Sequence, residues 1–256
     1  MSRPPGAILF ARYAYAPNSL GYCGPVDHRA LLDYAAAGSV DAGLRQLARG
    51  FEGAYPYLEL IARATGRADP LDARVVEAYW LGNDLLDEVD MRTFRASLQQ
   101  RFRRRAGTRW GFLAEAVPVG AVPNHAFHVF GVYPWIGLLN GDRRDTPLAA
   151  LDRCRIRWGQ VLSADGDEVV VRSRPLLFDG RRLALGPARA EVVERAVDGV
   201  GFVGELAAGE WVSLHWHWVC DRLTPRQLVN LRANTLRQLA IGNELVSHPP
   251  AATVLG

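Results

Sequence analysis

The chain has 256 residues, of which 49% are hydrophobic and 22% are charged, and its net charge at pH 7 is only +3. This composition is typical of a globular protein, and the length allows one large domain or two of ordinary size. The small net charge argues against a nucleic acid partner, and no apolar stretch reaches the roughly 18 residues that a membrane helix needs. Three cysteines without a disulfide spacing, and an N-terminus without a signal-peptide pattern, predict a cytoplasmic protein.

Residues 28–115 carry the signals of several helices. Four segments combine a glycine stop, an Asp-Pro start or apolar residues at helical spacing: 28–38, 40–50, 69–86 and 87–105. The last segment begins with acidic residues and ends in the basic run 101–105, an order that complements the helix dipole. We therefore interpret the basic run as a solvated helix end rather than a nucleic acid surface.

Residues 117–139 form an almost uncharged, aromatic run that is interrupted by prolines. Such a run must be buried or line a pocket. Its second half, 129–139, could form the core between two domains or the contact surface of a homodimer. The polar segment 140–147 that follows is typical of a linker.

From residue 152 onward, apolar and polar residues alternate with a period of two. Strands are predicted over 154–163 and 168–178, with a tight turn at 164–167 between them. Two further strands surround a turn at 207–209. Short strands separated by tight turns predict a small β-barrel.

The chain closes on a predicted helix. Thr224 is a good N-cap, Pro225 suits the first helical position, and leucines then recur on one side. The fold class is therefore α+β. Residues 1–147 would form an all-helical domain, and residues 148–256 a small β-barrel followed by a C-terminal helix.

Cys23 is the first candidate for chemistry, because it stands in the turn between Gly21 and Gly24-Pro25. Backbone N–H groups in such turns favour the thiolate, which would make Cys23 a nucleophile or a metal ligand. The alternative is a loop cysteine that packs inward as a small hydrophobic residue.

His125 and His128 form a second candidate site within the apolar run. They are three residues apart, so on a helix they share a face and could bind one metal or flank one ligand. Together with Cys23 they could build a catalytic pocket. The alternative is a pair of structural histidines, each bonded to a backbone carbonyl.

The segment 214–220, "LHWHWVC", holds the third candidate site. On a regular strand, His215 and His217 project to one face, while the tryptophans and Cys220 occupy the other. Two histidines on one face make half of a metal site, which needs a further donor. Cys154, at the start of the first predicted strand, could be that donor.

The order of these features resembles the HypC-type chaperones of nickel–iron hydrogenase assembly. In that family a cysteine is followed, after four residues, by Gly-x-Val, as Cys154 is here by the segment 159–161. An acidic-Gly turn and a Val-rich strand follow, matching 164–171, and a later strand places its histidine at His215. A closing helix completes the pattern.

The resemblance implies an OB-like barrel in which Cys154 and His215 carry iron with cyanide and carbon monoxide ligands. Its partners would be other hydrogenase maturation proteins or the hydrogenase large subunit. Thiolate and imidazole are suitable donors to such iron. Segments 12–25 and 124–135 resemble an uncharacterised actinobacterial and archaeal family, which implies no activity.

Three functions therefore remain open. The first is an accessory protein of hydrogenase maturation that binds or hands on an iron centre through Cys154 and His215. The second is a self-contained metal- or thiol-dependent enzyme with a pocket built from Cys23, His125 and His128. The third is a binding or adaptor protein whose histidines are structural.

Overall fold

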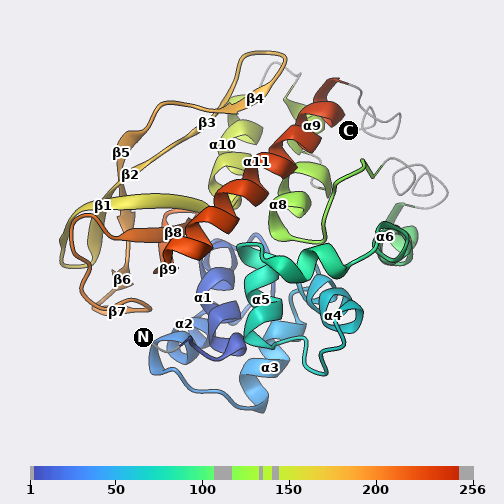
Figure 1. Ribbon diagram of the computed structural model, residues 1–256. Coiled ribbons are helices and arrows are strands. Elements are labelled where there is room, and N and C mark those ends of the chain that lie inside the picture. The colour runs from blue at the N-terminus through green and yellow to red at the C-terminus, as the bar shows by residue number, and fades with distance from the viewer. Residues whose placement is uncertain (1–2, 107–116, 133–134, 140–143, 248–256) are drawn as a thin grey trace.

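The computed structural model describes residues 3–106, 117–132, 135–139 and 144–247 (Figure 1). Within these ranges, no helix is both long enough and apolar enough to span a membrane. The side chains of the basic run 101–105 lie outside the described part, as do residues 140–143 of the predicted linker.

Helices make up the first part of the chain, as the sequence predicts. They are α1 (Gly6–Ser19), α2 (His28–Ala37), α3 (Ala42–Arg49), α4 (Tyr55–Ala64), α5 (Ala73–Trp80), the 3-10 helix η1 (Asp84–Glu88) and α6 (Met91–Ala106). An aspartate is the N-cap of α2, α3 and α5, namely Asp27, Asp41 and Asp72. Each side chain accepts a hydrogen bond from a backbone N–H of the first turn. The local capping pattern therefore explains where these helices start, although the Asp-Pro start predicted at Asp69 is three residues too early, because residues 69–72 form a turn before α5.

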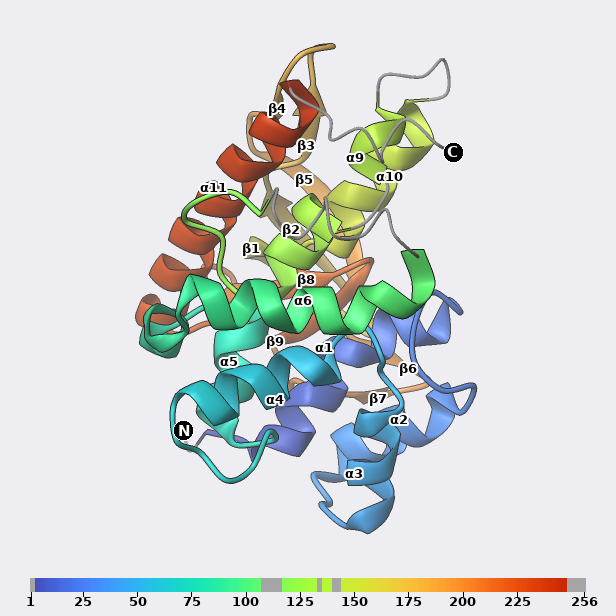
Figure 2. The same cartoon turned by 90° about the vertical axis from the view of Figure 1, so that its right-hand side faces the viewer.

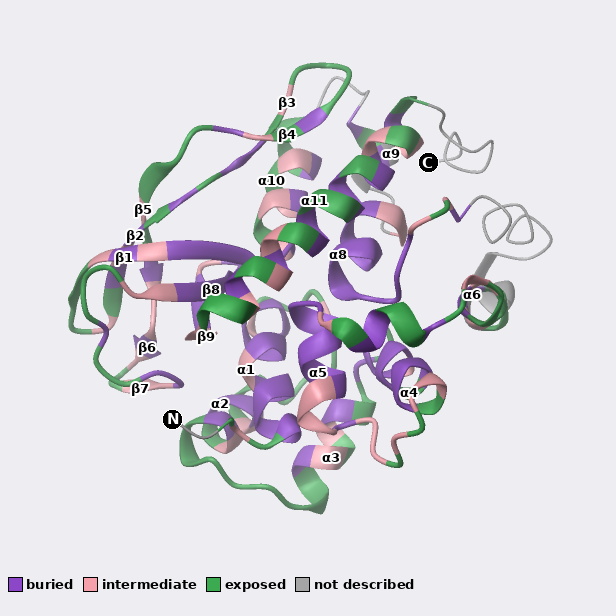
Figure 3. Ribbon diagram, in the orientation of Figure 1, coloured by how far each residue is buried: buried purple, intermediate pink, exposed green. Residues whose placement is uncertain are grey.

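Helix α1 is the exception, since no predicted helix covers it. Nearly all of its residues are buried, from Gly6 to Asn18, and it packs against α2, α5 and strand β9 (Trp218–Arg222). Figure 3 shows α1 and α5 as buried elements inside the molecule. A helix that is apolar on every side lacks the amphipathic pattern of a surface helix, so periodicity does not reveal it.

The apolar run 117–139 is buried in its described part. It contains α8 (His125–Phe127), which continues as the π-helical turn η3 (His128–Val132), and α9 (Trp135–Leu138). Phe130, Ile136 and Leu139 pack with residues of α10 (Asp145–Cys154) and α11 (Pro225–Ser247). Figure 2 shows α9 and α10 above α6 and the other N-terminal helices. The run therefore forms core between the two parts of the chain.

The strands confirm the α+β class. In the main sheet they are β1 (Arg157–Asp165), β2 (Glu168–Ser173), β5 (Arg189–Glu194), β8 (Trp211–His215) and β9. The pairing runs β1–β2–β5–β9–β8 and returns from β8 to β1. Between β5 and β9, however, the ring is joined by one parallel residue pair, Glu194 with Trp218. The five strands therefore curve toward a barrel, as predicted, but β5 and β9 are not joined by a continuous ladder of hydrogen bonds.

Two short hairpins extend from this sheet. Strand β3 (Leu176–Phe178) pairs with β4 (Leu183–Leu185), and β6 (Ala196–Val197) pairs with β7 (Val200–Gly201). Helix α11 lies diagonally across the molecule and contacts β4 as well as α8 and η3 (Figure 1). It thereby connects the sheet part to the apolar run.

The hydrophobic core is continuous across the predicted domain boundary at residues 147 and 148. One cluster joins Phe10 and Tyr13 of α1 to Trp218 and Cys220 of β9. The boundary itself lies inside α10, which begins at Asp145, where the sequence predicts a linker. The two parts therefore bury apolar surface against each other.

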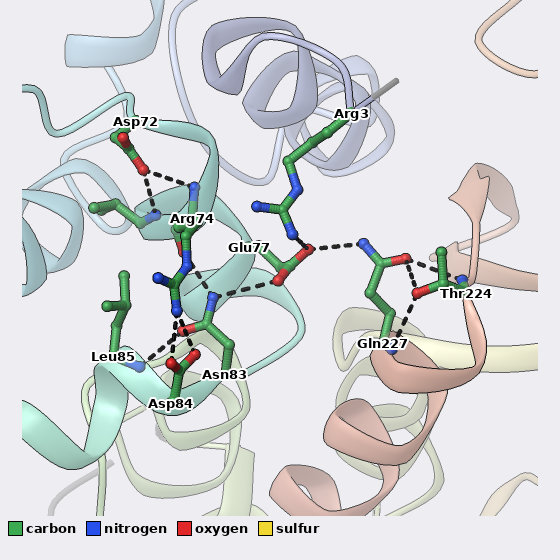
Figure 4. A network of polar contacts seen from close by, with 10 residues as sticks. Arg3, Asp72, Arg74, Glu77, Asn83, Asp84, Leu85, Thr224 and Gln227 are labelled. Carbon is green, nitrogen blue, oxygen red and sulfur yellow. Dashed lines mark hydrogen bonds and ion pairs between the residues drawn. The ribbon is translucent and has the colours of Figure 1, made fainter. Parts of the chain in front are cut away.

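A network of hydrogen bonds and an ion pair connects the start of α11 to α5 and Arg3 in the N-terminal part (Figure 4). The buried carboxylate of Glu77 on α5 accepts hydrogen bonds from Arg3 and from Gln227, both at 2.8 Å. Gln227 and Thr224 also form a reciprocal cap at the start of α11. The predicted N-cap at Thr224 is therefore present, and the same residues hold the closing helix against α5.

Candidate metal centre

His125, Cys154 and His215 meet at the junction between the two parts of the chain. Their ligand atoms lie within 4.8 Å of one another, and the two histidines are buried while Cys154 is partly buried. His125 is the first residue of α8, Cys154 the last of α10 and His215 the last of β8. Each donor therefore stands at the end of an element, where three elements converge.

Backbone contacts of Trp216 hold Cys154 and His215 side by side. The Trp216 N–H donates to the carbonyl oxygen of Arg153 at 2.7 Å, which joins the end of β8 to the end of α10. The Arg157 guanidinium donates to the Trp216 carbonyl, so both backbone groups of Trp216 are bonded. Trp216 has φ +55°, a left-handed conformation that is rare for a bulky residue and that tertiary contacts must enforce.

The sequence predicts that Cys154 is the first residue of a strand, and this is wrong. Cys154 is the last residue of helix α10, and strand β1 begins at Arg157. The last turns of the helix are stabilised because Leu151 packs in the core and Arg155, the residue after the helix, pairs with Asp152. The prediction that Cys154 supplies a donor near His215 nevertheless agrees with the positions of the two side chains.

His217 lies outside the cluster, contrary to the prediction that it shares a face with His215. The left-handed Trp216 ends the strand alternation, so His217 falls in the turn between β8 and β9. Its side chain is 42% exposed, and its Nε2 atom lies 3.4 Å from the carboxylate of Glu194. Cys220 is fully buried in β9, with its thiol directed at the Trp218 carbonyl.

The hydrogen bonds of His215 leave one nitrogen available as a ligand. Its Nδ1 atom lies 2.6 Å from the carbonyl oxygen of Tyr13, so Nδ1 carries the proton and donates it. Its Nε2 atom is buried and has no hydrogen-bond partner among the described residues. An unpaired buried acceptor is costly, and a metal ion would satisfy it.

His125 is held from both sides of its ring. Its Nε2 atom donates to the Cys154 carbonyl at 2.8 Å and lies 4.0 Å from the Cys154 sulfur, while Nδ1 is 3.3 Å from the Tyr79 hydroxyl. A metal bound at Nε2 would replace the bond to the carbonyl and move the ring proton to Nδ1. The Nδ1–H group would then donate a hydrogen bond to the Tyr79 hydroxyl. Metal-bound histidines commonly have such a hydrogen-bond partner on their second ring nitrogen.

The protonation states of the two imidazoles suit metal binding. Burial lowers the pKa of His125 to about 4 and holds the pKa of His215 well below its usual value. Both rings are therefore neutral at pH 7, which is the form that binds a metal. Burial also raises the pKa of the Cys154 thiol, so a metal ion would have to displace its proton on binding.

A cavity of about 280 Å³ opens beside the three donors. Cys23 and His128 also line it, so the residues that the sequence assigns to two separate sites share one space. His128 lies with its Nδ1 atom 3.3 Å from the Tyr57 hydroxyl. Burial raises the pKa of Cys23 to about 12, which overturns the prediction that its glycine turn favours the thiolate.

Aromatic residues of α1 and α5 complete the site. The Trp80 ring packs against the imidazoles of His125 and His215, with centroids 4.7 and 5.6 Å away, and Tyr13 and Tyr79 supply the hydrogen bonds described above. Sequence reasoning did not single out these residues. Their only local signal is the aromatic content of two helices, which is equally typical of an ordinary core.

A family of proteins of unknown function, DUF6390, matches residues 2–249. The chain belongs to this family. Its match spans the helical part, the sheet and α11, so the three donors all lie within the DUF6390 region. No curated protein and no solved structure shows significant similarity to the chain. The resemblance to HypC-type chaperones therefore stays a prediction.

Proposed function

We propose that this DUF6390 protein binds a transition metal ion through His125, Cys154 and His215. The observation that carries the proposal is the buried Nε2 atom of His215, which lacks a partner in the described part and lies close to the other two donors. Two neutral imidazoles and one thiol form a donor set suited to iron or zinc and unsuited to magnesium or calcium.

Three protein donors leave at least one coordination position for another ligand. Zinc and iron sites that act on a substrate commonly have this arrangement, whereas structural zinc sites are closed by four protein ligands. The cavity adjoins the donors and gives such a ligand room. The geometry therefore favours a centre that exchanges or carries a ligand over one that only stabilises the fold.

Within this role, we propose an accessory protein of nickel–iron hydrogenase maturation. The two residues that the HypC resemblance implies, Cys154 and His215, are 61 positions apart, and their ligand atoms meet in one cluster. The protein would bind or hand on an iron centre and its diatomic ligands. Its partners would be other maturation proteins or the hydrogenase large subunit.

The experiment is anaerobic purification followed by metal analysis and infrared spectroscopy in the cyanide and carbonyl stretching region. We expect bound iron with such bands, and loss of both in Cys154→Ala and His215→Ala. Cys220→Ala and His217→Ala are matched controls, because these residues lie outside the cluster. Metal retained unchanged in Cys154→Ala and His215→Ala would refute the metal site. Zinc or iron without infrared bands would refute only the maturation role.

A second candidate function is a self-contained metal-dependent enzyme. The observation that favours it is that Cys23 and His128 line the same cavity as the three donors, where they could contact a substrate. This function predicts that Cys23→Ala retains the metal but loses turnover. An adaptor with structural histidines instead predicts that no metal binds at one ion per chain.

A further inference from the structure

The cavity beside the three donors has the features of a binding site for a small organic ligand. Apart from the histidines and cysteines, its walls are largely aromatic and aliphatic: Pro17, Tyr22, Phe51, Ala54, Tyr79, Trp80, Ala150 and Trp216. No Asp, Glu, Lys or Arg lines it among the residues that the structure places. A charge on the part of the ligand that faces these walls, away from the metal, would therefore lose its hydration without gaining an ion pair.

The size of the cavity limits the ligand. A volume of about 280 Å³ is near the lower end of small-molecule sites. Since a water molecule occupies roughly 30 Å³ of the liquid, the space corresponds to about nine water molecules, which limits the ligand to a small one. Flat rings of Trp80, Phe51 and Trp216 form much of the wall, and such walls favour a flat aromatic ligand.

One side of the cavity is closed by a stacked aromatic pair. Tyr22 lies on Trp216 with ring centroids 4.3 Å apart and planes inclined by 13°. Tyr22 is 58% exposed, whereas Trp216 is only 6% exposed, so the pair stands between solvent and the interior. The left-handed backbone of Trp216, bonded on both sides, keeps this ring in the wall despite the conformational cost.

We infer that this cavity binds a small, flat, uncharged nitrogen heterocycle whose ring nitrogen takes the open position on the metal. The inference rests on the proposed metal centre, not on the proposed maturation role, and names the class of ligand that takes its open position. The aromatic walls hold the ring body, and the metal selects the donor atom. Tyr22 and Trp216 together exclude larger ligands.

The test uses the full chain loaded with cobalt(II), whose visible spectrum reports both thiolate coordination and the number of ligands. Benzimidazole fits the cavity, and we expect it to shift the cobalt bands with a saturable, one-to-one titration. Benzimidazole-5-carboxylate and 2-phenylbenzimidazole carry the same donor with a charge or with excess bulk. We expect each of them to bind at least tenfold more weakly.

Two alanines of α10 provide matched variants. Ala150 lines the cavity, whereas Ala149 is exposed on the same helix. Ala150→Leu should retain the cobalt spectrum and weaken benzimidazole at least tenfold, while Ala149→Leu should change neither. If cobalt fails to bind, the proposed function itself is refuted. If cobalt binds and benzimidazole leaves its spectrum unchanged, or if the two variants respond alike, only the ligand inference is refuted.

Discussion

The protein has two pairs of closely spaced histidines, one on helical backbone and one at the end of a strand, and each pair supplies one residue to the candidate metal site. His125 and His128 are three residues apart on helical backbone, and His215 and His217 are two apart near the end of a strand. In each pair only the first histidine joins the cluster of three candidate metal ligands. His128 lines the cavity at a ring distance of 6.5 Å from His125, and His217 lies at the surface.

The comparison shows that periodicity places a side chain only while its element continues. The α-helix changes to a π-helical turn at His128, and the strand ends in a left-handed turn at Trp216. π-Helical turns are frequent at functional sites, and left-handed bulky residues need tertiary support. Trp216 directly follows the donor His215, and the π-helical turn begins three residues after the donor His125.

The first prediction separates the members of the second pair. His215→Ala removes a proposed ligand, so we expect the affinity for cobalt or zinc to fall by more than about 100-fold. Loss of a residue that only hydrogen-bonds a metal ligand costs less than this. His217→Ala should leave the affinity within about twofold. Competition with a chromophoric chelator measures both. Equal losses in the two variants would show that the pairs do not differ in the way the structure indicates.

The second prediction concerns Arg157, whose guanidinium donates a hydrogen bond to the backbone of Trp216. Arg157 bonds the Trp216 carbonyl and pairs with Glu191, and its side chain is only 5% exposed. Arg157→Met leaves Glu191 without its buried partner and should lower the free energy of unfolding by about 4 kcal/mol. Arg29→Met breaks the exposed pair with Asp33 and should cost less than about 0.5 kcal/mol. Urea unfolding of the metal-free proteins provides the measurement.

The third prediction is a pH dependence of the metal-free protein. The pKa of His125 is about 4 when folded and about 6.5 when unfolded, so the unfolded chain binds more protons between these values. This stabilising contribution, roughly 3 kcal/mol, is complete above pH 6.5 and is lost as the pH falls toward 4. His125→Gln should flatten the fall in stability over this range. An unchanged slope would contradict the buried, neutral His125.

The smallest expected effect compares two tyrosines that face the first histidine pair. Tyr79 lies 3.3 Å from Nδ1 of His125, and Tyr57 lies 3.3 Å from Nδ1 of His128. Tyr79→Phe removes a hydrogen bond that orients a proposed ligand, so metal affinity should fall about tenfold. Tyr57→Phe should change it by less than about twofold. A larger loss in Tyr57→Phe would identify His128, rather than His125, as the metal ligand.

Features decided by neighbouring residues could be predicted from the sequence. The starts of α2 and α3 and the cap at Thr224 depend on side chains within three positions of the backbone groups that they bind. The start of α5 follows the same rule, but at Asp72 and not at the predicted Asp69. The resemblance to HypC-type chaperones also paired Cys154 with His215, and the ligand atoms of these two residues lie in one cluster. Those residue types are rare enough in this chain for their coincidence to be informative.

Other features depend on contacts between distant segments, and only the tertiary structure decided them. The burial of α1 and the pairing of Trp216 with Arg153 bring together residues far apart in the chain. The same contacts ended the strand before His217, extended α10 to Cys154 and placed His125 beside both partners. The sequence by itself determined which donors the chain possesses and where most helices start. Long-range packing determined which donors meet, because backbone conformation at Trp216 and burial at His215 are set by neighbours that no local pattern contains.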